Sequence, residues 1–463
     1  MASTIRIEQL LTPLRESIIN KQPYISGTLQ LPDSCFPLFY KVAKDDHAAR
    51  HINLANATPD EVEQLTQACG PVGKMDSECF SPMLDPFHTE LVKIIRDYLL
   101  EGTESKEVIK TEPYELNVYS KGSFFEAHDV NTPRSEKMFG SLVVVFPTHH
   151  EGGALLLRHR GQEWIFDSDQ APAAKCQPSI GYVAFFSDVE HEVAPVISGH
   201  RITLTYNLYF DDGGPVSAND AISEPPQPVN EDAIHEAFVA LLESPEFLAD
   251  GGTLAFGLRH VYPIKRERVS IAMKSLHPIE NYLKHLCGVL KGSDSVVYQS
   301  ACALGFEPVL YLYYEWTGRT DRASPTSPPL GVITDKVMDF NELQADMGQD
   351  LVGFAQSEGG ILVARAKLRE GGGSAIMLES RFESPELLEW VTPMTTFNRQ
   401  EDVYPARYGP RSKPGLRWVS GYVCLVVRIG KGGDRLAYPT VGELSRRNLI
   451  KRMADDDDDD IYM

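Results

Sequence analysis

The chain has 463 residues, of which 42% are hydrophobic, so it can bury a large core and is expected to form two or more domains. Its formal net charge of -21 at pH 7 and its sequence pI of about 5.1 argue against nucleic acid as a partner, because phosphate binding needs a concentrated basic face. No uncharged apolar run approaches the roughly 18 residues that span a bilayer, so no membrane partner is expected either.

Residues 1–110 are expected to form a mixed, largely helical support region. Residues 58–68 begin with Thr-Pro-Asp-Glu and repeat apolar positions at helical spacing, which predicts a short helix with a proline in its first turn. A longer amphipathic helix is predicted over residues 86–100, because its apolar side chains fall on one stripe. This second helix is expected to brace a sheet from outside.

Short β-rich runs separated by turn residues fill residues 111–211. They lie at 115–119, 141–146, 154–158, 163–166, 182–186 and 202–210. Glycines at 152, 153 and 161 supply the turns. This crowding of strands, with almost no helix between them, predicts a double-sheet jelly roll or barrel.

A linker rich in Gly, Pro, Ser and Asp is predicted at residues 212–230 and marks the best candidate domain boundary. Beyond it, a C-terminal α+β domain is predicted over residues 231–453. Its helices are expected at 231–242 and 279–291, its strands at 252–258, 309–314, 362–366, 375–378 and 421–429, and its Gly-rich turns at 292–294 and 371–373. The acidic tail, residues 454–463, is expected to stay solvated and disordered because its aspartates repel one another.

The cysteine pattern and the N-terminus predict the cellular compartment. Seven cysteines are scattered without a Cys-x-x-Cys pair, and their odd number argues against a disulfide framework. The first residues lack a basic start followed by a continuous apolar stretch, which a secretory signal would need. We therefore expect a cytoplasmic or nuclear protein.

Two histidines in the jelly-roll region point to metal chemistry. His128 follows a strand-like segment, and His191 follows the 182–186 strand after a short acidic turn. A ferrous ion that binds dioxygen must keep open positions, so a protein typically supplies two imidazoles and one carboxylate on one face. Strands of a rigid barrel can hold such ligands in place. The sequence thus predicts that both histidines bind a metal.

Arg201 opens a strand whose residues alternate between two faces. Arg201 and Thr203 are expected on one face, and the apolar residues that follow each of them on the other. A guanidinium that points into a barrel is a good clamp for a dicarboxylate, because its planar fork meets both oxygens of a carboxylate. Tyr119 is expected to donate a further hydrogen bond.

The stretch from Leu116 to Tyr209 resembles the catalytic domain of the Fe(II)- and 2-oxoglutarate-dependent dioxygenases, in the prolyl 4-hydroxylase-like branch. The lead-in that carries the resemblance is Tyr-x-x-Gly-x-x-Phe-x-x-His, matched here by Tyr119, Gly122, Phe125 and His128. The family's fold is a double-stranded β-helix.

The resemblance also implies roles for individual residues. His191 resembles the distal iron ligand, Arg201 the arginine that binds the far carboxylate of 2-oxoglutarate, and Thr203 its hydroxyl companion. The implied metal ligands are His128, Asp129 and His191, and the implied co-substrate residues are Arg201, Thr203 and Tyr119. Fe(II) and 2-oxoglutarate are the implied cofactor and co-substrate, with ascorbate as an optional reductant.

The sequence departs from the family at the third ligand. The family's His-x-Asp-Thr-Pro-Arg reads here His-Asp-Val-Asn-Thr-Pro-Arg from His128, and Val130 cannot bind a metal. A β-bulge that turns Asp129 inward restores a carboxylate ligand. If Thr-Pro-Arg sets the register instead, Asn131 supplies a neutral amide. If neither reaches the metal, the site resembles the two-histidine halogenases or an inactive descendant.

Other polar residues of the region are expected to play no part as ligands. His149 and His150 are predicted to lie in a solvated turn, and His200 to face away from the site. His159 is predicted to be part of a basic surface spot, with a role near substrate as the alternative. Asp188 is expected either to orient His191 or to lie in an exposed turn.

The function that the resemblance implies is hydroxylation of a C–H bond in a protein side chain or a small metabolite. Two alternatives follow from the altered third ligand: a catalytically impaired binding or scaffold protein, and a halogenase-like enzyme. The substrate, a protein or a small molecule, is not specified by any motif in the sequence.

Overall fold

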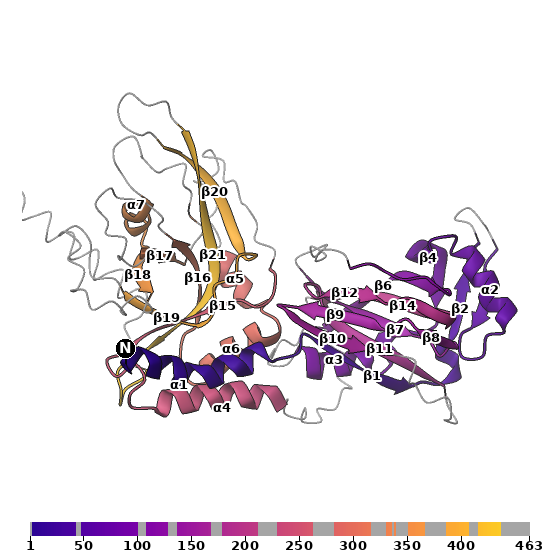
Figure 1. The fold of residues 1–463 in the computed structure, drawn as a ribbon, viewed down its shortest axis with the longest axis horizontal. Coiled ribbons are helices and arrows are strands. Elements are labelled where there is room, and N and C mark those ends of the chain that lie inside the picture. Colours follow the sequence, from indigo (N-terminus) through magenta and orange to yellow (C-terminus); the bar gives the residue numbers. More distant parts are fainter. Residues whose placement is uncertain are drawn as a thin grey trace, which may run out of the picture. The chain divides into compact units, whose positions relative to one another are not determined.

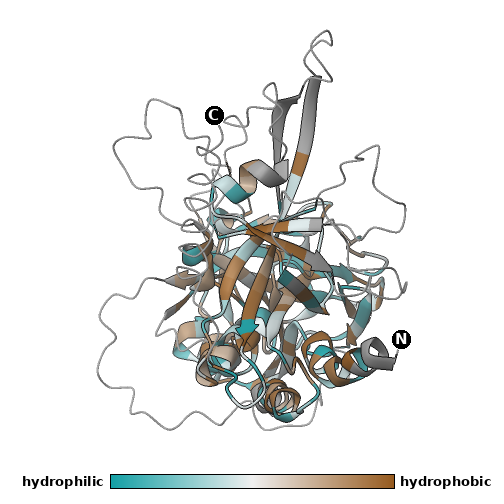
Figure 2. Cartoon of the chain, turned by 90° about the vertical axis from the view of Figure 1, so that its left-hand side faces the viewer, coloured by the Kyte–Doolittle hydropathy of each residue, from teal (hydrophilic) through white to brown (hydrophobic). Residues whose placement is uncertain are grey.

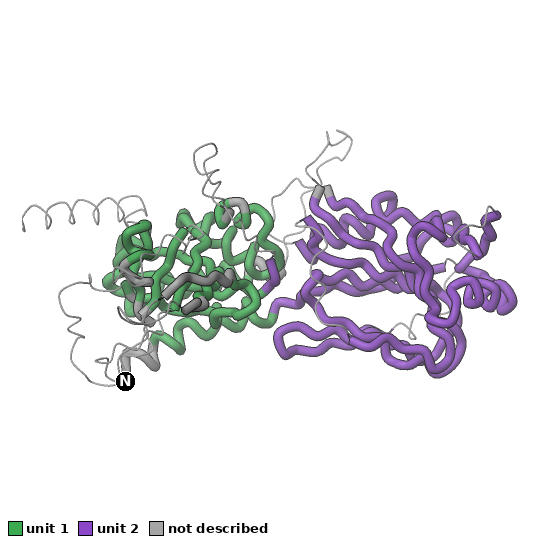
Figure 3. The backbone as a smooth tube through the Cα atoms, turned by 90° about the horizontal axis from the view of Figure 1, so that it is seen from above, with its two compact units in different colours: residues 1–20, 230–259, 264–463 green, residues 21–229, 260–263 purple. Residues whose placement is uncertain are grey.

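The computed structural model describes residues 2–42, 48–100, 108–127, 137–167, 178–211, 229–262, 282–315, 330–335, 338, 351–365, 386–406 and 415–436. The chain forms two compact units (Figure 3). Unit 1 comprises residues 1–20, 230–259 and 264–463, and unit 2 comprises residues 21–229 and 260–263. This division differs from the predicted one, because residues 1–20 group with the C-terminal part of the chain and residues 260–263 group with the jelly-roll region.

Unit 2 is built mainly of strands (Figure 1). Its elements are β1 (Tyr24–Gln30), η1 (Asp33–Cys35), β2 (Pro37–Tyr40), β3 (Arg50–Asn53), α2 (Pro59–Ala68), β4 (Lys74–Asp76), η2 (Ser77–Cys79), β5 (Phe80–Pro82), η3 (Pro86–His88), α3 (Leu91–Leu99), β6 (Val108–Tyr119), β7 (Met138–Val145), β8 (His150–Gly152), β9 (Leu155–His159), β10 (Gln162–Phe166), β11 (Ser179–Phe186), β12 (Glu190–Val193), β13 (Val196–Gly199) and β14 (Arg201–Asp211). All the strands predicted in this region are present. The prediction missed the short strands β8, β12 and β13, and it also missed strands β1 to β5 in residues 1–110, where it expected mainly helices.

The strands of unit 2 form one large sheet and several small ones. The large antiparallel sheet has the order β1-β11-β7-β14-β6-β4, and three small sheets have the orders β10-β9-β12, β13-β8 and β3-β2-β5. One hydrophobic core joins the large sheet to the β9 sheet, because Val143 and Val183 of the large sheet belong to the same buried cluster as Leu155 and Leu157 of β9. A large antiparallel sheet and smaller sheets around one core agree with the jelly-roll prediction.

The central strand β14 is buried on both faces. Ile202, Leu204 and Tyr206 lie on one face and are at most 1% exposed, and the Tyr206 hydroxyl donates to the Leu84 carbonyl at 2.6 Å. The opposite face carries Arg201 and Thr203, which are also buried. The predicted alternation is therefore confirmed. The polar face of β14 therefore lies in the protein interior, where its side chains need hydrogen-bonding partners.

Two helices flank the sheets. α2 begins with a capping box, in which Thr58 and Glu61 bond reciprocally, as the Thr-Pro-Asp-Glu start predicts. α3 starts later than predicted, because Thr89 is extended and separates it from the 3-10 turn η3. The apolar side of α3 is buried through Leu91 and Ile95. This burial agrees with the predicted bracing role, since α3 packs against β1 and β11.

Unit 1 combines helices with one mixed sheet. Its elements are α1 (Ala2–Ile19), α4 (Val229–Glu243), β15 (Gly252–Gly257), α5 (Tyr282–Cys287), α6 (Gly292–Ala303), β16 (Val309–Glu315), β17 (Leu330–Thr334), α7 (Leu351–Ser357), β18 (Ile361–Arg365), β19 (Glu386–Thr392), β20 (Arg399–Ala406) and β21 (Gly415–Ile429). The sheet order is β15-β19-β18-β17-β16-β21-β20, and β15 also pairs with β21. All strands except β20 therefore close into a ring. Hydrophobic residues are prominent on the strands (Figure 2).

Two local features of unit 1 explain differences from the prediction. Gly292-Ser293-Asp294, predicted as a turn, is the first turn of α6, where the Asp294 carboxylate accepts the Arg259 backbone N–H at 2.8 Å. The helix α1 was not predicted, and it is held against β19 by hydrogen bonds from Arg15 to backbone carbonyls of that strand.

Some predicted features lie outside the described residues. They include most of the 212–230 linker, the 375–378 strand, the 371–373 turn and the acidic tail. Within the described ranges, cysteines occur as free thiols, and no helix combines the length and hydropathy needed to cross a bilayer.

Candidate active site

The interior face of β14 and β6 carries a polar group of four residues. Arg201 lies opposite Tyr119 in the antiparallel register, and Thr203 lies opposite Asn117. Since cross-strand partners share a face, all four side chains enter the same space. Each is at most 9% exposed. We call these four residues the polar bay.

The Arg201 side chain is buried, and two of its nitrogen atoms lack hydrogen-bond acceptors among the described residues. It is 1% exposed, and in the described part of the chain its Nε and Nη2 atoms have no hydrogen-bond acceptor. Burial lowers the pKa of Arg201 to about 10, against the opposing influence of Tyr119 and Asp167, so the side chain is still charged at neutral pH. A buried guanidinium with free donors is costly unless an anion joins it. The bay therefore fits a carboxylate ligand.

Tyr119 supports Arg201 from the neighbouring strand. The guanidinium carbon lies 5.7 Å from the centroid of the Tyr119 ring, within the range of a cation–π contact. Burial raises the pKa of Tyr119 to about 12, so its hydroxyl stays protonated and able to donate. The structure thus brings together Arg201, Thr203 and Tyr119, the three residues predicted to bind the co-substrate.

The sequence analysis missed Asn117 and Gly153. Asn117 lies two residues before Tyr119 on the same strand face, and its Oδ1 lacks a hydrogen-bond partner among the described residues. Gly153 has φ +73, and a Cβ there would lie 2.7 Å from Cδ of Arg201. Glycine at 153 therefore makes room for the arginine. The available signals were strand parity for Asn117 and the Gly-Gly pair for Gly153.

His191 lies on β12, beside the interior. It pairs with Leu157 of β9, and its ring packs against Phe125 at 5.7 Å and Phe185 at 5.0 Å between centroids. A backbone bridge joins Phe125 to Val193, so the chain that leads toward residue 128 runs beside β12. This placement is compatible with the predicted ligand role of His191.

The other predicted ligands cannot be placed. His128, Asp129 and Asn131 lie outside the described residues, so the choice between a carboxylate, an amide and no third ligand stays open. The predicted set therefore stays a prediction, and His191 is its only described member.

A second cluster of metal-binding side chains was not predicted. His159, Asp188 and His260 are all buried, and their ligand atoms lie within 4.8 Å of one another. Asp188 contacts His159 Nε2 and His260 Nδ1, each at 3.2 Å, and accepts the Val261 backbone N–H at 3.0 Å. Two imidazoles and a carboxylate are a donor set that Fe(II) or Zn(II) accepts.

This cluster corrects two predictions. His159 does not lie on the surface, because alternate residues of β9 are buried and His159 continues the inward series of Leu155 and Leu157. Its neighbour Arg158 does face outward, and it forms ion pairs with Glu163, Glu190 and Glu192. Asp188 is 3% exposed and does not lie in an exposed turn. Period-2 alternation in β9 was the signal that could have found His159.

The register along β9 orders the two histidine sites relative to Arg201. Gly153, which touches Arg201, precedes β9, His191 pairs with the middle of the strand, and His159 ends it. At about 3.3 Å per residue, the strand from Leu155 to His159 advances about 13 Å. Along β9, the His191 pairing position therefore lies between Gly153 and His159.

The remaining predictions concern other histidines and the surface. His149 is exposed, as predicted, but His150 is 7% exposed and its Nδ1 lies 2.8 Å from the Thr148 carbonyl oxygen, so a solvated position for His150 is wrong.

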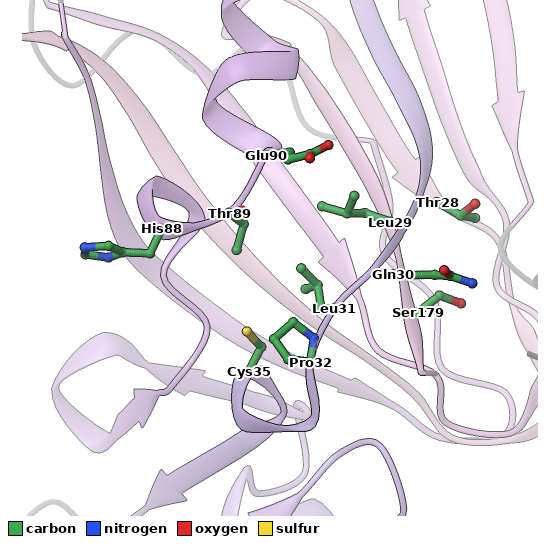
Figure 4. Close-up of a pocket in the computed structure, with 10 residues that line it drawn as sticks. All are labelled: Thr28, Leu29, Gln30, Leu31, Pro32, Cys35, His88, Thr89, Glu90 and Ser179. Carbon is green, nitrogen blue, oxygen red and sulfur yellow. The ribbon is translucent and has the colours of Figure 1, made fainter. Parts of the chain in front are cut away.

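A pocket of about 500 Å³ opens elsewhere in unit 2 (Figure 4). It is lined by Thr28, Leu29, Gln30, Leu31, Pro32, Cys35, His88, Thr89, Glu90 and Ser179. None of the predicted site residues lines it, so it does not locate the chemistry.

Comparison with solved structures gives distant likenesses. A prolyl-4-hydroxylase from Pseudomonas putida is 19% identical, with 44% of this chain and 94% of that chain covered and a TM-score of 0.23. A prolyl 4-hydroxylase from Phytophthora capsici is 17% identical, with 52% of this chain and 85% of that chain covered and a TM-score of 0.24. A 2OG-Fe(II) oxygenase family oxidoreductase from Burkholderia pseudomallei is 15% identical, with 40% of this chain and 66% of that chain covered and a TM-score of 0.20. At these values the likenesses carry no weight for substrate or activity.

Comparison with protein families is more informative. A search of curated proteins found no match. Residues 114–209 match the family described as "2OG-Fe(II) oxygenase superfamily", and this range includes Tyr119, His128, His191, Arg201 and Thr203. The predicted resemblance to the iron and 2-oxoglutarate-dependent dioxygenases is thereby confirmed for this segment, together with the two cofactors that the family description names.

Proposed function

We propose that unit 2 is an Fe(II)- and 2-oxoglutarate-dependent dioxygenase that hydroxylates a C–H bond of a protein side chain or a small metabolite. The observation that carries the proposal is the buried Arg201, whose Nε and Nη2 lack acceptors among the described residues. A folded protein rarely keeps such donors unless a ligand completes them. A dicarboxylate supplies the missing charge and oxygen atoms.

The residues of the polar bay bind and orient the co-substrate. Arg201 meets one carboxylate with its planar fork, and a bidentate pair of this kind fixes direction as well as affinity. Tyr119 holds the guanidinium from the side and donates its hydroxyl hydrogen, while Thr203 and Asn117 offer further polar atoms from the next cross-strand pair on the same face.

His191 would hold the iron together with His128 and either Asp129 or Asn131. Bound iron, with 2-oxoglutarate and dioxygen, supplies the oxidising power for inserting oxygen into a C–H bond. The protein's part is to position the imidazole and to keep water out. Phe125 and Phe185 position His191, because their rings pack against the imidazole and restrict its rotation.

Anaerobic binding tests the proposal directly. Addition of Fe(II) and 2-oxoglutarate to the purified protein is expected to produce a weak metal-to-ligand charge-transfer band. Arg201→Ala is expected to lose the band at co-substrate concentrations that saturate the wild type. Loss of a buried charged partner costs about 2–5 kcal/mol, which corresponds to a fall in affinity of roughly 30-fold to several-thousand-fold.

The matched control is Arg158→Ala, which removes a partly exposed arginine from the same unit. It is expected to keep the band, because exposed ion pairs contribute little. If the wild type gives no band with saturating iron and consumes no 2-oxoglutarate, the oxygenase proposal is wrong and a binding or scaffold role is favoured.

Substitutions at the third ligand decide between the remaining alternatives. If Asp129 binds iron, Asp129→Ala weakens Fe(II) binding while Asn131→Ala does not, and the reverse result identifies Asn131. If neither substitution changes iron affinity and product formation requires chloride, the halogenase-like alternative is supported.

A further inference from the structure

Three buried side chains from separate parts of the sequence meet at one place in unit 2. His159 comes from the end of β9, Asp188 from the turn that follows β11, and His260 from the segment 260–263, which returns to unit 2 after β15. The side chains of all three are at most 4% exposed. Burial of two imidazoles and a carboxylate in one place is costly unless they satisfy one another or a cation.

The distances fit ligands around a metal ion. His159 Nε2 and His260 Nδ1 lie 3.2 Å from different oxygens of Asp188, which is longer than the usual N–H···O hydrogen bond of about 2.9 Å. Ligands at about 2.1 Å from a tetrahedral zinc ion are about 3.4 Å apart. Arg160 Nη2 lies 3.6 Å from the same carboxylate, at ion-pair distance.

The surroundings also favour a fixed site. The rings of His159 and His260 stack at 5.3 Å between centroids, and Phe186 packs against His260 at 4.5 Å. The Val261 backbone N–H donates to the Asp188 carboxylate at 3.0 Å and so fixes its orientation. Such packing and second hydrogen bonds hold metal ligands in one orientation.

We propose that His159, Asp188 and His260 form a second metal site, which binds Zn(II) and ties residues 260–263 to the jelly roll. This site is separate from the iron centre proposed at His191, since His159 ends β9 whereas His191 pairs with its middle. Three protein ligands leave one tetrahedral position for water. Because the cluster is buried, the ion contributes to folding and needs no part in oxygen chemistry.

Metal analysis of the full-length protein tests the site independently of activity. His191→Ala, which removes the proposed iron ligand, is expected to retain one equivalent of Zn(II) after dialysis in chelator-free buffer. Asp188→Asn and His260→Gln, made in the same His191→Ala background, are expected to lower Zn(II) affinity at least tenfold. His149→Ala removes an exposed histidine of the same unit and is expected to leave zinc binding unchanged.

Co(II) gives a second readout that needs no variant of the cluster. Metal-depleted His191→Ala protein titrated with Co(II) is expected to develop the strong visible absorption of a tetrahedral site with nitrogen and oxygen ligands. No Zn(II) retention and no such spectrum would leave a purely hydrogen-bonded cluster and overturn the proposal, as would zinc binding that survives Asp188→Asn and His260→Gln. The charge-transfer band that depends on Arg201 tests the proposed function separately.

Discussion

Arg201 and Tyr119 lie directly opposite each other on β14 and β6, and the guanidinium carbon of Arg201 is 5.7 Å from the centre of the Tyr119 ring. The tyrosine ring thus covers a charge that lacks hydrogen-bond acceptors on Nε and Nη2 within the described residues. A cation–π contact contributes about 0.5–2 kcal/mol, which is less than the cost of burying a guanidinium with free donors. The cation–π contact therefore offsets only part of the cost of burying Arg201, and an anion would offset the rest.

Arg201→Met is expected to stabilise the protein in the absence of co-substrate. The substitution replaces a buried charge by an apolar chain of similar length, and such replacements stabilise by on the order of 1–4 kcal/mol. Urea unfolding of metal-free protein measures the effect. The wild type, but not the variant, is expected to gain about 2.7 kcal/mol of stability at a 2-oxoglutarate concentration of roughly 100 times Kd.

The opposite outcome would contradict this account of Arg201. If Arg201→Met destabilises the metal-free protein and 2-oxoglutarate still stabilises the variant, then the guanidinium has partners and the co-substrate binds elsewhere. Arg158→Met is the control, and it is expected to change stability by less than about 0.5 kcal/mol, because Arg158 is partly exposed.

Strand periodicity predicted which residues of β14 share a face. Alternation along β14 placed Arg201 and Thr203 on one face, and the structure has both buried on the side where Tyr119 lies. The same alternation buries Leu155, Leu157 and His159 of β9, so the predicted surface position of His159 is wrong. The neighbouring Arg158 and Arg160 favour a surface position for His159, but the alternation of side chains along the strand decides its burial.

Long-range assembly was not predictable from local patterns. His260 lies far from Asp188 in sequence, and no motif connects them, because their contact depends on a segment that returns to unit 2. The ring of strands in unit 1 has the same origin, since β15 pairs with both β19 and β21. Helix α1 groups with unit 1 through hydrogen bonds from Arg15 to β19, which is also a contact between the two ends of the sequence.

Gly153→Ala is expected to weaken 2-oxoglutarate binding by displacing Arg201. The new Cβ would lie 2.7 Å from Cδ of Arg201, and the backbone has φ +73, where an L side chain is strained by about 1–2 kcal/mol. Gly161→Ala is the matched control, because Gly161 has φ +81 but nothing within 4 Å of a Cβ. Both variants carry the backbone strain, but Gly153→Ala is expected to lose more stability because of the clash, and only Gly153→Ala is expected to lose affinity. Equal affinities would show that Gly153 does not position Arg201.

Co-substrate binding is expected to weaken as the pH rises through about 10. Burial lowers the pKa of Arg201 to about 10, so the charge that attracts the carboxylate is present below this pH and is lost above it. Affinity should then fall about tenfold per pH unit, as for loss of one proton. Tyr119, whose pKa burial raises to about 12, stays neutral in this range. Calorimetry on metal-free protein between about pH 8 and pH 10.5 measures the change, and a flat profile would contradict the charge-based clamp.

Arg201 is expected to affect folding stability in the opposite direction from 2-oxoglutarate affinity as the pH rises. Because the pKa of Arg201 in the folded protein lies below its ordinary value, the folded state binds fewer protons than the unfolded state above about pH 10. The penalty for burying the charge is therefore present at neutral pH and is relieved as the pH rises past 10. The contribution of Arg201 to stability should increase over the interval in which binding declines, and Arg201→Met should lack both trends.

Tyr119→Phe and Tyr119→Leu separate the two roles of the tyrosine. Phenylalanine keeps the ring over the guanidinium and removes only the hydroxyl, so 2-oxoglutarate affinity is expected to fall about 3–10-fold, as for one hydrogen bond of about 0.5–1.5 kcal/mol. Leucine also removes the ring, so Arg201 loses its cation–π contact and its lateral support. Tyr119→Leu is therefore expected to bind 2-oxoglutarate more weakly than Tyr119→Phe, by a further 3-fold or more. This is the effect expected from losing a cation–π contact of about 0.5–2 kcal/mol. Titration of the charge-transfer band measures both variants. If they bind equally, the ring does not hold Arg201, and the bay depends on the hydroxyl alone.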